Sequence, residues 1–296
     1  MRMHMKRGRA AFSVLGLVAL VGIGVMGVST SVAGAAPKSP ANYKNKLSSS
    51  THGWCTAAQG CDGQYNEYGT IDIVKPSYSN SGGYGAYAAA PTGQRKYARV
   101  SGAPGEGYDN TADTTESITG RSPAGAENCS GPYTVYGSGT DSVFPTAGFT
   151  SSIKIYIDTV WGNANQGQVV DWDTSLNTNT GSFLEDNMFN LCSGSGGWFV
   201  SESQNAGGCS SGPTELTSSG WYTFSQDFSS LAGVVYCTYT VLNSSGGTVW
   251  TTTVPVNDPS TGQPEQTSAT GGPNYGWLPD EDVLGLPIAD ISLTRN

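Results

Sequence analysis

The sequence predicts an all-β fold, a two-sheet antiparallel β-sandwich with little or no helix beyond the N-terminal segment. Three observations support this prediction. Hydrophobic and polar residues alternate over many short stretches, which is the period of a strand with one buried face. Clusters of Gly, Ser, Asn and Pro separate these stretches, as turns separate the strands of sandwiches and barrels. No stretch after residue 36 shows a sustained 3.6-residue period with helix caps.

The clearest alternation runs through residues 152–158, whose three isoleucines fall on one face. Residues 221–228 should bury Tyr222, Phe224 and Phe228. Residues 235–241 and 248–252 flank a Gly-containing turn, which predicts a hairpin. The last strand, 288–293, should place three apolar side chains on one face: Ala289, Ile291 and Leu293.

The N-terminus has the three parts of a secretory signal peptide, which we place at residues 1–36. A basic start is followed by the apolar run 10–26 and by small residues up to Ala36. An uncleaved membrane anchor is the alternative, although the run is short and rich in Gly. No second long apolar stretch follows, so we expect a secreted protein that leaves the membrane after cleavage.

The chain is acidic and otherwise weakly charged. It has 14 basic and 23 acidic residues, and charged residues make up 12% of it. Removal of residues 1–36 takes four basic residues and no acidic one, which leaves a net charge of −13. Such a surface repels phosphate backbones, so nucleic acid is not an expected partner.

About 260 residues remain after cleavage, enough for one good core. We expect a short lead-in over residues 37–62 and the sandwich domain over 63–296. Residues 102–131 are rich in Gly, Ala, Thr and Pro without alternation, which predicts a long surface insertion.

Six cysteines follow the signal peptide, and an even number in an exported chain predicts disulfides. Proximity in the sequence favours Cys55–Cys61 and Cys192–Cys209, which leaves Cys129–Cys237. We therefore predict three disulfides and no free thiol. A cysteine metal site is the alternative, but no CxxC spacing is present.

Several catalytic classes are excluded by composition. His52 is the one histidine after residue 36, and no GxSxG motif is present, which leaves no serine triad of the hydrolase type. Zinc bound by two histidines and the common nucleotide-binding loops are excluded in the same way. His52 is interpreted as a surface residue.

Carboxylates and aromatic rings are the remaining candidates for ligand contacts. Asp171 and Asp173 flank Trp172, so both should project from one face of a strand. Such a pair fits a glycosidase, although solvated or structural acids are the alternative. Sugars stack on aromatic rings, and Trp161 and Trp277 follow or border turns where a ring could form the rim of a site. Most of the tryptophans are otherwise expected in the core, and Trp172, which alternates with Val170, is expected to be buried.

Residues 279–282 form a tight acidic loop, Pro-Asp-Glu-Asp. Clustered carboxylates of this kind are what calcium prefers. A solvated turn is the alternative.

Segments 148–158, 220–224, 272–277 and 288–291 resemble a group of secreted bacterial proteins of unknown function. The resemblance covers roughly residues 145–296. It implies a jelly-roll sandwich of the concanavalin A-like lectin/glucanase type, and it implies no catalytic residues.

The final strand also resembles that of jelly-roll carbohydrate-binding modules, in which an Asp often helps to hold a structural calcium. Asp290 matches that position, while Ala289 departs from the large residue that usually precedes it. The resemblance implies a calcium site at Asp290, and we expect Asp72 on an early strand as a second ligand.

The leading hypothesis is a secreted, non-catalytic domain that binds a glycan or another cell-surface polymer, with Trp161, Asp171, Asp173 and Trp277 as ligand contacts. The alternatives are an extracellular glycoside hydrolase or polysaccharide lyase that uses carboxylates, and a structural surface protein. The sequence leaves open the ligand, the disulfide pairing and the oligomeric state.

Overall fold

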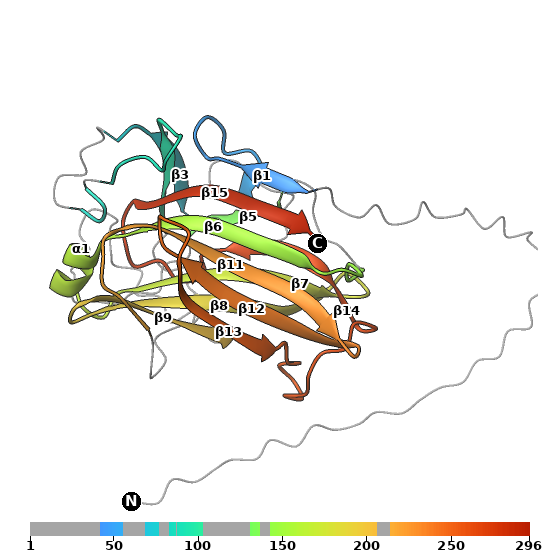
Figure 1. Cartoon of the computed structure of the whole chain (residues 1–296). Coiled ribbons are helices and arrows are strands. Elements are labelled where there is room, and N and C mark those ends of the chain that lie inside the picture. Colours follow the sequence, from blue (N-terminus) through green and yellow to red (C-terminus); the bar gives the residue numbers. More distant parts are fainter. Residues whose placement is uncertain are drawn as a thin grey trace, which may run out of the picture. The chain divides into compact units, whose positions relative to one another are not determined.

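The computed structural model describes residues 42–55, 69–76, 83–86, 88–102, 131–136, 143–205 and 214–296. These residues all belong to one compact unit, Pro37–Asn296. The expected signal peptide and residues 103–130 of the expected insertion lie outside them. Within these ranges the structure has fifteen strands in two sheets and one short helix, α1 (Thr159–Ala164), which confirms the all-β sandwich (Figure 1).

The first sheet has the order β13-β12-β11-β6-β15-β4-β3, and β1 pairs with β15 beside it. All its neighbouring strands are antiparallel. Its strands are β1 (Tyr43–Asn45), β3 (Thr70–Val74), β4 (Tyr97–Ser101), β6 (Phe149–Ile157), β11 (Gly220–Leu231), β12 (Val234–Leu242), β13 (Thr248–Pro255) and β15 (Leu286–Arg295).

The second sheet has the order β10-β9-β8-β7-β14-β5-β2 and is also antiparallel throughout. Its strands are β2 (Trp54–Cys55), β5 (Tyr133–Thr134), β7 (Val169–Thr178), β8 (Phe183–Gly194), β9 (Gly197–Gln204), β10 (Thr214–Leu216) and β14 (Thr270–Trp277). The expected lead-in therefore contributes one short strand to each sheet.

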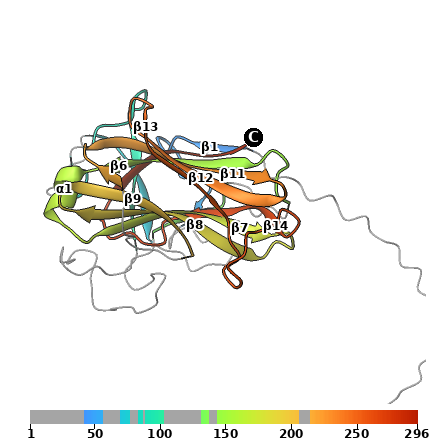
Figure 2. The same ribbon diagram turned by 60° about the horizontal axis from the view of Figure 1, so that its bottom comes forward.

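The core lies between the two layers, which Figure 2 shows nearly edge-on. The isoleucines of β6 and the predicted aromatic residues of β11 are buried in it, as the alternation predicted. Phe189 of β8 meets Phe224 of β11 edge to face across the layers, with ring centroids 5.2 Å apart. The predicted hairpin is also present as β12 and β13.

The last strand departs from simple alternation at Asp290. This residue has a φ of 45°, and the pairing of β15 with β6 shifts register between Ala289 and Ser292. As a result Ile291 and Leu293 face the core, whereas Ala289 packs against Tyr97 in a separate cluster. The prediction that all three share one face is therefore wrong, because a bulge inserts one extra residue.

Among the described residues, no helix has both the length and the apolar character that a membrane crossing requires.

Candidate functional site

Three of the four predicted ligand residues meet on the face of the second sheet that points away from the core, called the outer face below. Asp171 and Asp173 of β7 lie on it, while Trp172 between them is fully buried in the core. Trp277 of β14 is paired with Asp173 across the two strands. The alternation in β7 therefore predicted correctly that the two aspartates share a face.

Trp161 lies elsewhere, on α1. Asp158 caps this helix by accepting a hydrogen bond from the backbone N–H of Trp161 at 3.0 Å. The Trp161 ring lies parallel to that of Trp198, with centroids 6.4 Å apart, and contacts Tyr84 edge to face at 5.1 Å. The Trp161 side chain is thus packed against the core at one end of the sandwich, and it is not brought to the other three residues.

A carboxyl group that the sequence did not single out, that of Asp186, joins the outer face. Ser175 is opposite Asp186 and Asp173 is opposite Met188, so Asp173 and Asp186 are diagonal neighbours on adjacent strands. Asp173 Oδ1 accepts a hydrogen bond from the backbone N–H of Asn187 at 2.8 Å. Asp173 Oδ2 accepts none.

Burial disfavours the charged forms of both carboxyl groups. Burial raises the pKa of Asp173 well above its usual range, and the neighbouring carboxylate of Asp186 raises it further. Burial raises the pKa of Asp186 to about 6, while hydrogen bonding with Asp173 acts in the opposite direction and lowers this pKa. Both carboxyl groups therefore ionise less readily than exposed carboxyl groups do.

Aromatic side chains border this acid pair. The Tyr275 hydroxyl donates to Asp186 Oδ1 at 3.4 Å, and the Tyr275 ring lies 6.3 Å from that of Trp277 and 6.2 Å from that of Tyr133. The Trp277 indole N–H donates to the backbone oxygen of Gly131 at 3.1 Å. Tyr275 is nearly buried and Trp277 is partly exposed.

Gly276 explains how β14 presents these two rings outward. A Cβ atom at Gly276 would lie 2.4 Å from Tyr136 Oη and 2.7 Å from Trp172 Cη2. A glycine is therefore needed for β14 to lie this close to the core, and the residues on either side of it, Tyr275 and Trp277, face the other way.

The outer face also holds buried polar atoms without a hydrogen-bond partner. Asn190 Nδ2 donates to Asp171 Oδ1 at 2.9 Å, but Asn190 Oδ1 accepts nothing. Neither side-chain polar atom of Asn177 has a partner. Both residues are completely buried. Since buried polar groups are nearly always paired, such a group needs an explanation, for which a ligand or water is one.

The acidic loop 279–282 continues this acidic surface. The Asp171 N–H donates to the backbone oxygen of Asp280 at 2.8 Å, and Asp282 Oδ2 accepts from the Val169 N–H at 2.8 Å. Glu281 is fully buried and Asp282 nearly so. The reading of this loop as a solvated turn is therefore wrong: backbone pairing ties it to the start of β7.

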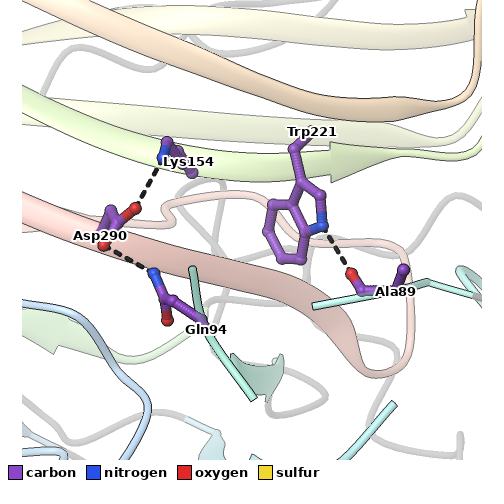
Figure 3. Close-up of polar contacts among 5 residues, drawn as sticks. All are labelled: Ala89, Gln94, Lys154, Trp221 and Asp290. Carbon is purple, nitrogen blue, oxygen red and sulfur yellow. Dashed lines mark hydrogen bonds and ion pairs between the residues drawn. The ribbon is translucent and has the colours of Figure 1, made fainter. Parts of the chain in front are cut away.

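The residues expected to bind calcium lie on the first sheet and have other surroundings. Asp290 accepts from Lys154 Nζ at 2.6 Å and from Gln94 Nε2 at 2.7 Å (Figure 3). Asp72 is exposed on β3, which β4 separates from β15. Across the described ranges, no three His, Cys, Asp or Glu side chains are grouped so that they could hold a metal ion. Calcium binding stays a prediction.

The cysteine framework needs a correction. Cys237 is a free thiol on the core face of β12, with none of its surface exposed, so the predicted Cys129–Cys237 pair and the absence of free thiols are wrong. Its neighbours Val235 and Tyr239 alternate with it into the core. Cys192 is disulfide-bonded. Cys61, Cys129 and Cys209 lie outside the described residues.

A groove of about 280 Å³ is present at another place, between the β10–β11 turn and the β12–β13 turn. Trp221, Glu215 and Asn243 are among the residues that line it. None of the predicted ligand residues lies there, and its polar lining contains no buried charge. The outer face of the second sheet is therefore the stronger candidate site.

Comparison with known proteins adds little to this description. No protein-family profile matches the chain, and no curated protein matches it. One similar solved structure is that of a variant of the family 7 alginate lyase A1-II′ in complex with its substrate. It is 13% identical, with a TM-score of 0.25, over 86% of this chain and 91% of that one.

Proposed function

We propose that the protein is a secreted glycan-binding sandwich and that the outer face of the second sheet is its binding face. The supporting observation is that this face carries the buried acids Asp171, Asp173 and Asp186, the aromatic rings of Tyr275 and Trp277, and buried amide groups that lack partners. Sugar recognition requires polar groups that hydrogen-bond hydroxyls and aromatic rings that cover the C–H faces of the sugar. Both are present on this face.

Secretion is part of the proposal and rests on the N-terminal segment, with its basic start, apolar run and small-residue end. Expression of the full chain in a bacterium with a secretory pathway should release a protein that begins near residue 36 or 37. N-terminal sequencing of the released protein tests this, and a cell-bound, uncleaved product would support the membrane anchor.

Binding is tested by affinity electrophoresis of the purified protein through gels that contain soluble polysaccharides of different charge. We expect retardation by at least one polysaccharide and loss of that retardation in Trp277→Ala. Trp221→Ala is the matched control, because Trp221 belongs to the first sheet, where its indole donates to the backbone oxygen of Ala89 at 2.7 Å (Figure 3). Equal loss in both variants, or no retardation by any polymer, would refute the proposal.

A second candidate, a carboxylate-dependent glycoside hydrolase, is favoured by one observation: burial raises the pKa of the Asp173 carboxyl well above its usual range. A protonated carboxyl is the general acid that glycosidic cleavage requires. Asp171 lies two residues away on the same face, about 7 Å along the strand, a separation within the range of hydrolase carboxyl pairs. Asp173 would protonate the leaving oxygen, and Asp171 would act as the base or nucleophile.

Binding and hydrolysis are separated by measuring both in one variant. A hydrolase would release reducing ends from the polymer that it binds, and Asp173→Asn would abolish this release while retaining the binding. If the unmodified protein binds the polymer but releases no reducing ends from it, the binding function is supported. Hydrolysis of that polymer is then excluded.

A further inference from the structure

β13 is a terminal strand of the first sheet, and it differs from the other strands at the sheet edges. It has eight residues and, among the described strands, pairs with β12 alone (Figure 1). The other terminal strands have two to five residues. All of them except β2 carry a charged side chain: Lys44 on β1, Asp72 on β3 and Glu215 on β10. Short length and charge are two ways in which natural proteins keep sheet edges from pairing with other chains.

The edge of β13 has neither of these features. The sequence has no Lys, Arg, His, Asp or Glu over residues 228–257, which include all of β12 and β13. Val249, Thr251 and Thr253 are exposed. A bulge interrupts the pairing with β12 near Val249, and beyond it the pairing is regular as far as Pro255. Since alternate N–H and C=O groups of an edge strand point away from its neighbour, this part of β13 can pair with a further strand.

The regular part of β13 has a symmetric sequence. Residues 250–254 read Trp-Thr-Thr-Thr-Val. When two such strands pair antiparallel about Thr252, Thr251 of each lies opposite Thr253 of the other. Trp250 then lies opposite Val254. Pairs of threonines and pairs of an aromatic with a β-branched residue are favourable cross-strand neighbours, so the strand is complementary to a second copy of itself.

The threonine pairs of such an arrangement already exist on one side of β13. The hydroxyls of Thr251 and Thr240 are 3.2 Å apart, and those of Thr253 and Thr238 are 2.9 Å apart. A further strand with threonines in the same register would extend these two rows across the new edge.

We propose that β13 is a dimerisation edge and that its partner is β13 of a second copy of this chain. Without residues 1–36 the chain has a net charge of −13, so two copies repel each other over most approaches and least at an uncharged edge. A two-fold axis through Thr252 uses both edges at once, which gives a closed dimer with one continuous sheet. This dimer does not depend on the proposed glycan binding.

The test is sedimentation velocity of the purified protein from about 1 μM to about 1 mM, since a contact of one strand is at the small end of specific interfaces. We expect conversion of monomer to dimer and no larger species. Thr251→Lys places a charge on the exposed edge and should abolish the dimer. Thr70→Lys is the matched control, because Thr70 is exposed on β3 at another edge of the same sheet. It changes the net charge equally and should retain the dimer.

Hydrogen exchange locates the contact. The β13 amides that point away from β12 should exchange more slowly at the highest protein concentration, while the β3 amides keep their rate. A protein that stays monomeric throughout overturns the proposal and leaves the edge to a strand of a different protein. A dimer that persists in Thr251→Lys, that is lost in both variants, or that leaves exchange over β13 unchanged also overturns it. Assembly beyond the dimer overturns the closed two-fold pairing.

Discussion

Asp173 on β7 and Asp186 on β8 are diagonal neighbours on the outer face of the second sheet, and burial raises the pKa of both carboxyl groups. These raised pKa values make the stability of the protein depend on pH in a defined direction.

Stability should fall as the pH rises from 4 towards 9. Burial raises the pKa of Asp186 to about 6 and that of Asp173 well above its usual range. Burial and the nearby carboxylate of Glu265 raise the pKa of Glu185 to about 9. The folded state therefore binds protons that the unfolded state has already released. For each such proton, the free energy of unfolding falls by about 1.4 kcal/mol per pH unit between the pKa of the group in the unfolded state and its pKa in the folded state.

The measurement is the melting temperature between pH 4.5 and pH 9. We expect it to be highest at the acidic end and to decline above it. Glu185→Gln should flatten the curve above pH 6, because a neutral amide has no proton to lose. A melting temperature that increases with pH would contradict the raised pKa values of these buried acids.

Gly276→Ala should destabilise the fold by about 1–3 kcal/mol, the usual range for overpacking. The added methyl would overlap Tyr136 and Trp172, both of which are buried. Gly220→Ala is the matched control, since no atom lies within 4 Å of its Cβ position, and its effect should stay within about 0.5 kcal/mol. Urea denaturation of both variants tests the close approach of β14 to the core, and equal stability of the two would refute it.

Alternation alone predicted much of the outer face. It placed Asp171 and Asp173 together and Trp172 inside, because neighbouring side chains of a strand point to opposite faces. It could not reveal Asp186, because that requires the pairing of β7 with β8, which local sequence does not encode. Trp161 was predicted to border a turn, and its place in α1 was missed because no hydrophobic period follows the helix cap at Asp158.

Cys237 shows a different kind of error. The prediction of its disulfide relied on the even number of cysteines, although its alternation with Val235 and Tyr239 already placed it in the core. The error at Ala289 was of the opposite kind, because alternation was extended across a β-bulge. The left-handed backbone of Asp290 and the bulge beside it leave no periodic signal in the sequence.

Thiol titration should therefore detect Cys237 only after unfolding. Burial raises the pKa of the Cys237 thiol well above its usual range, and burial also blocks the reagent, so this thiol should be unreactive in the native protein. Denaturation without reductant should expose at least one thiol, and Cys237→Ala should lower the number by one. Absence of titratable thiol in the denatured, unreduced protein would restore the prediction of three disulfides.

The ion pair of Lys154 with Asp290 gives a competing account of the expected calcium site. Both side chains are partly exposed, at 32% and 21%, and such pairs contribute about 0–1 kcal/mol. A double-mutant cycle of Lys154→Met and Asp290→Asn should give a coupling in this range. Asparagine is chosen because it tolerates the positive φ of this position.

Calcium dependence is measured on the same variants. A structural calcium at Asp290 would raise the melting temperature of the unmodified protein with increasing free calcium, and this effect would vanish in Asp290→Asn. If the ion pair is the whole role of Asp290, calcium and chelator should leave all melting temperatures unchanged.

The location of the ligand is the most direct test of the central claim, that the outer face of the second sheet binds glycan. Oxidative footprinting compares the reactivity of Trp277 and Trp221 with and without a saturating oligosaccharide, taken from a polysaccharide that retards the protein in affinity electrophoresis. We predict protection of Trp277 by the ligand and no change at Trp221. Protection of Trp221, which lines the groove between the β10–β11 and β12–β13 turns, with an unchanged Trp277, would contradict the account and place the ligand at that groove.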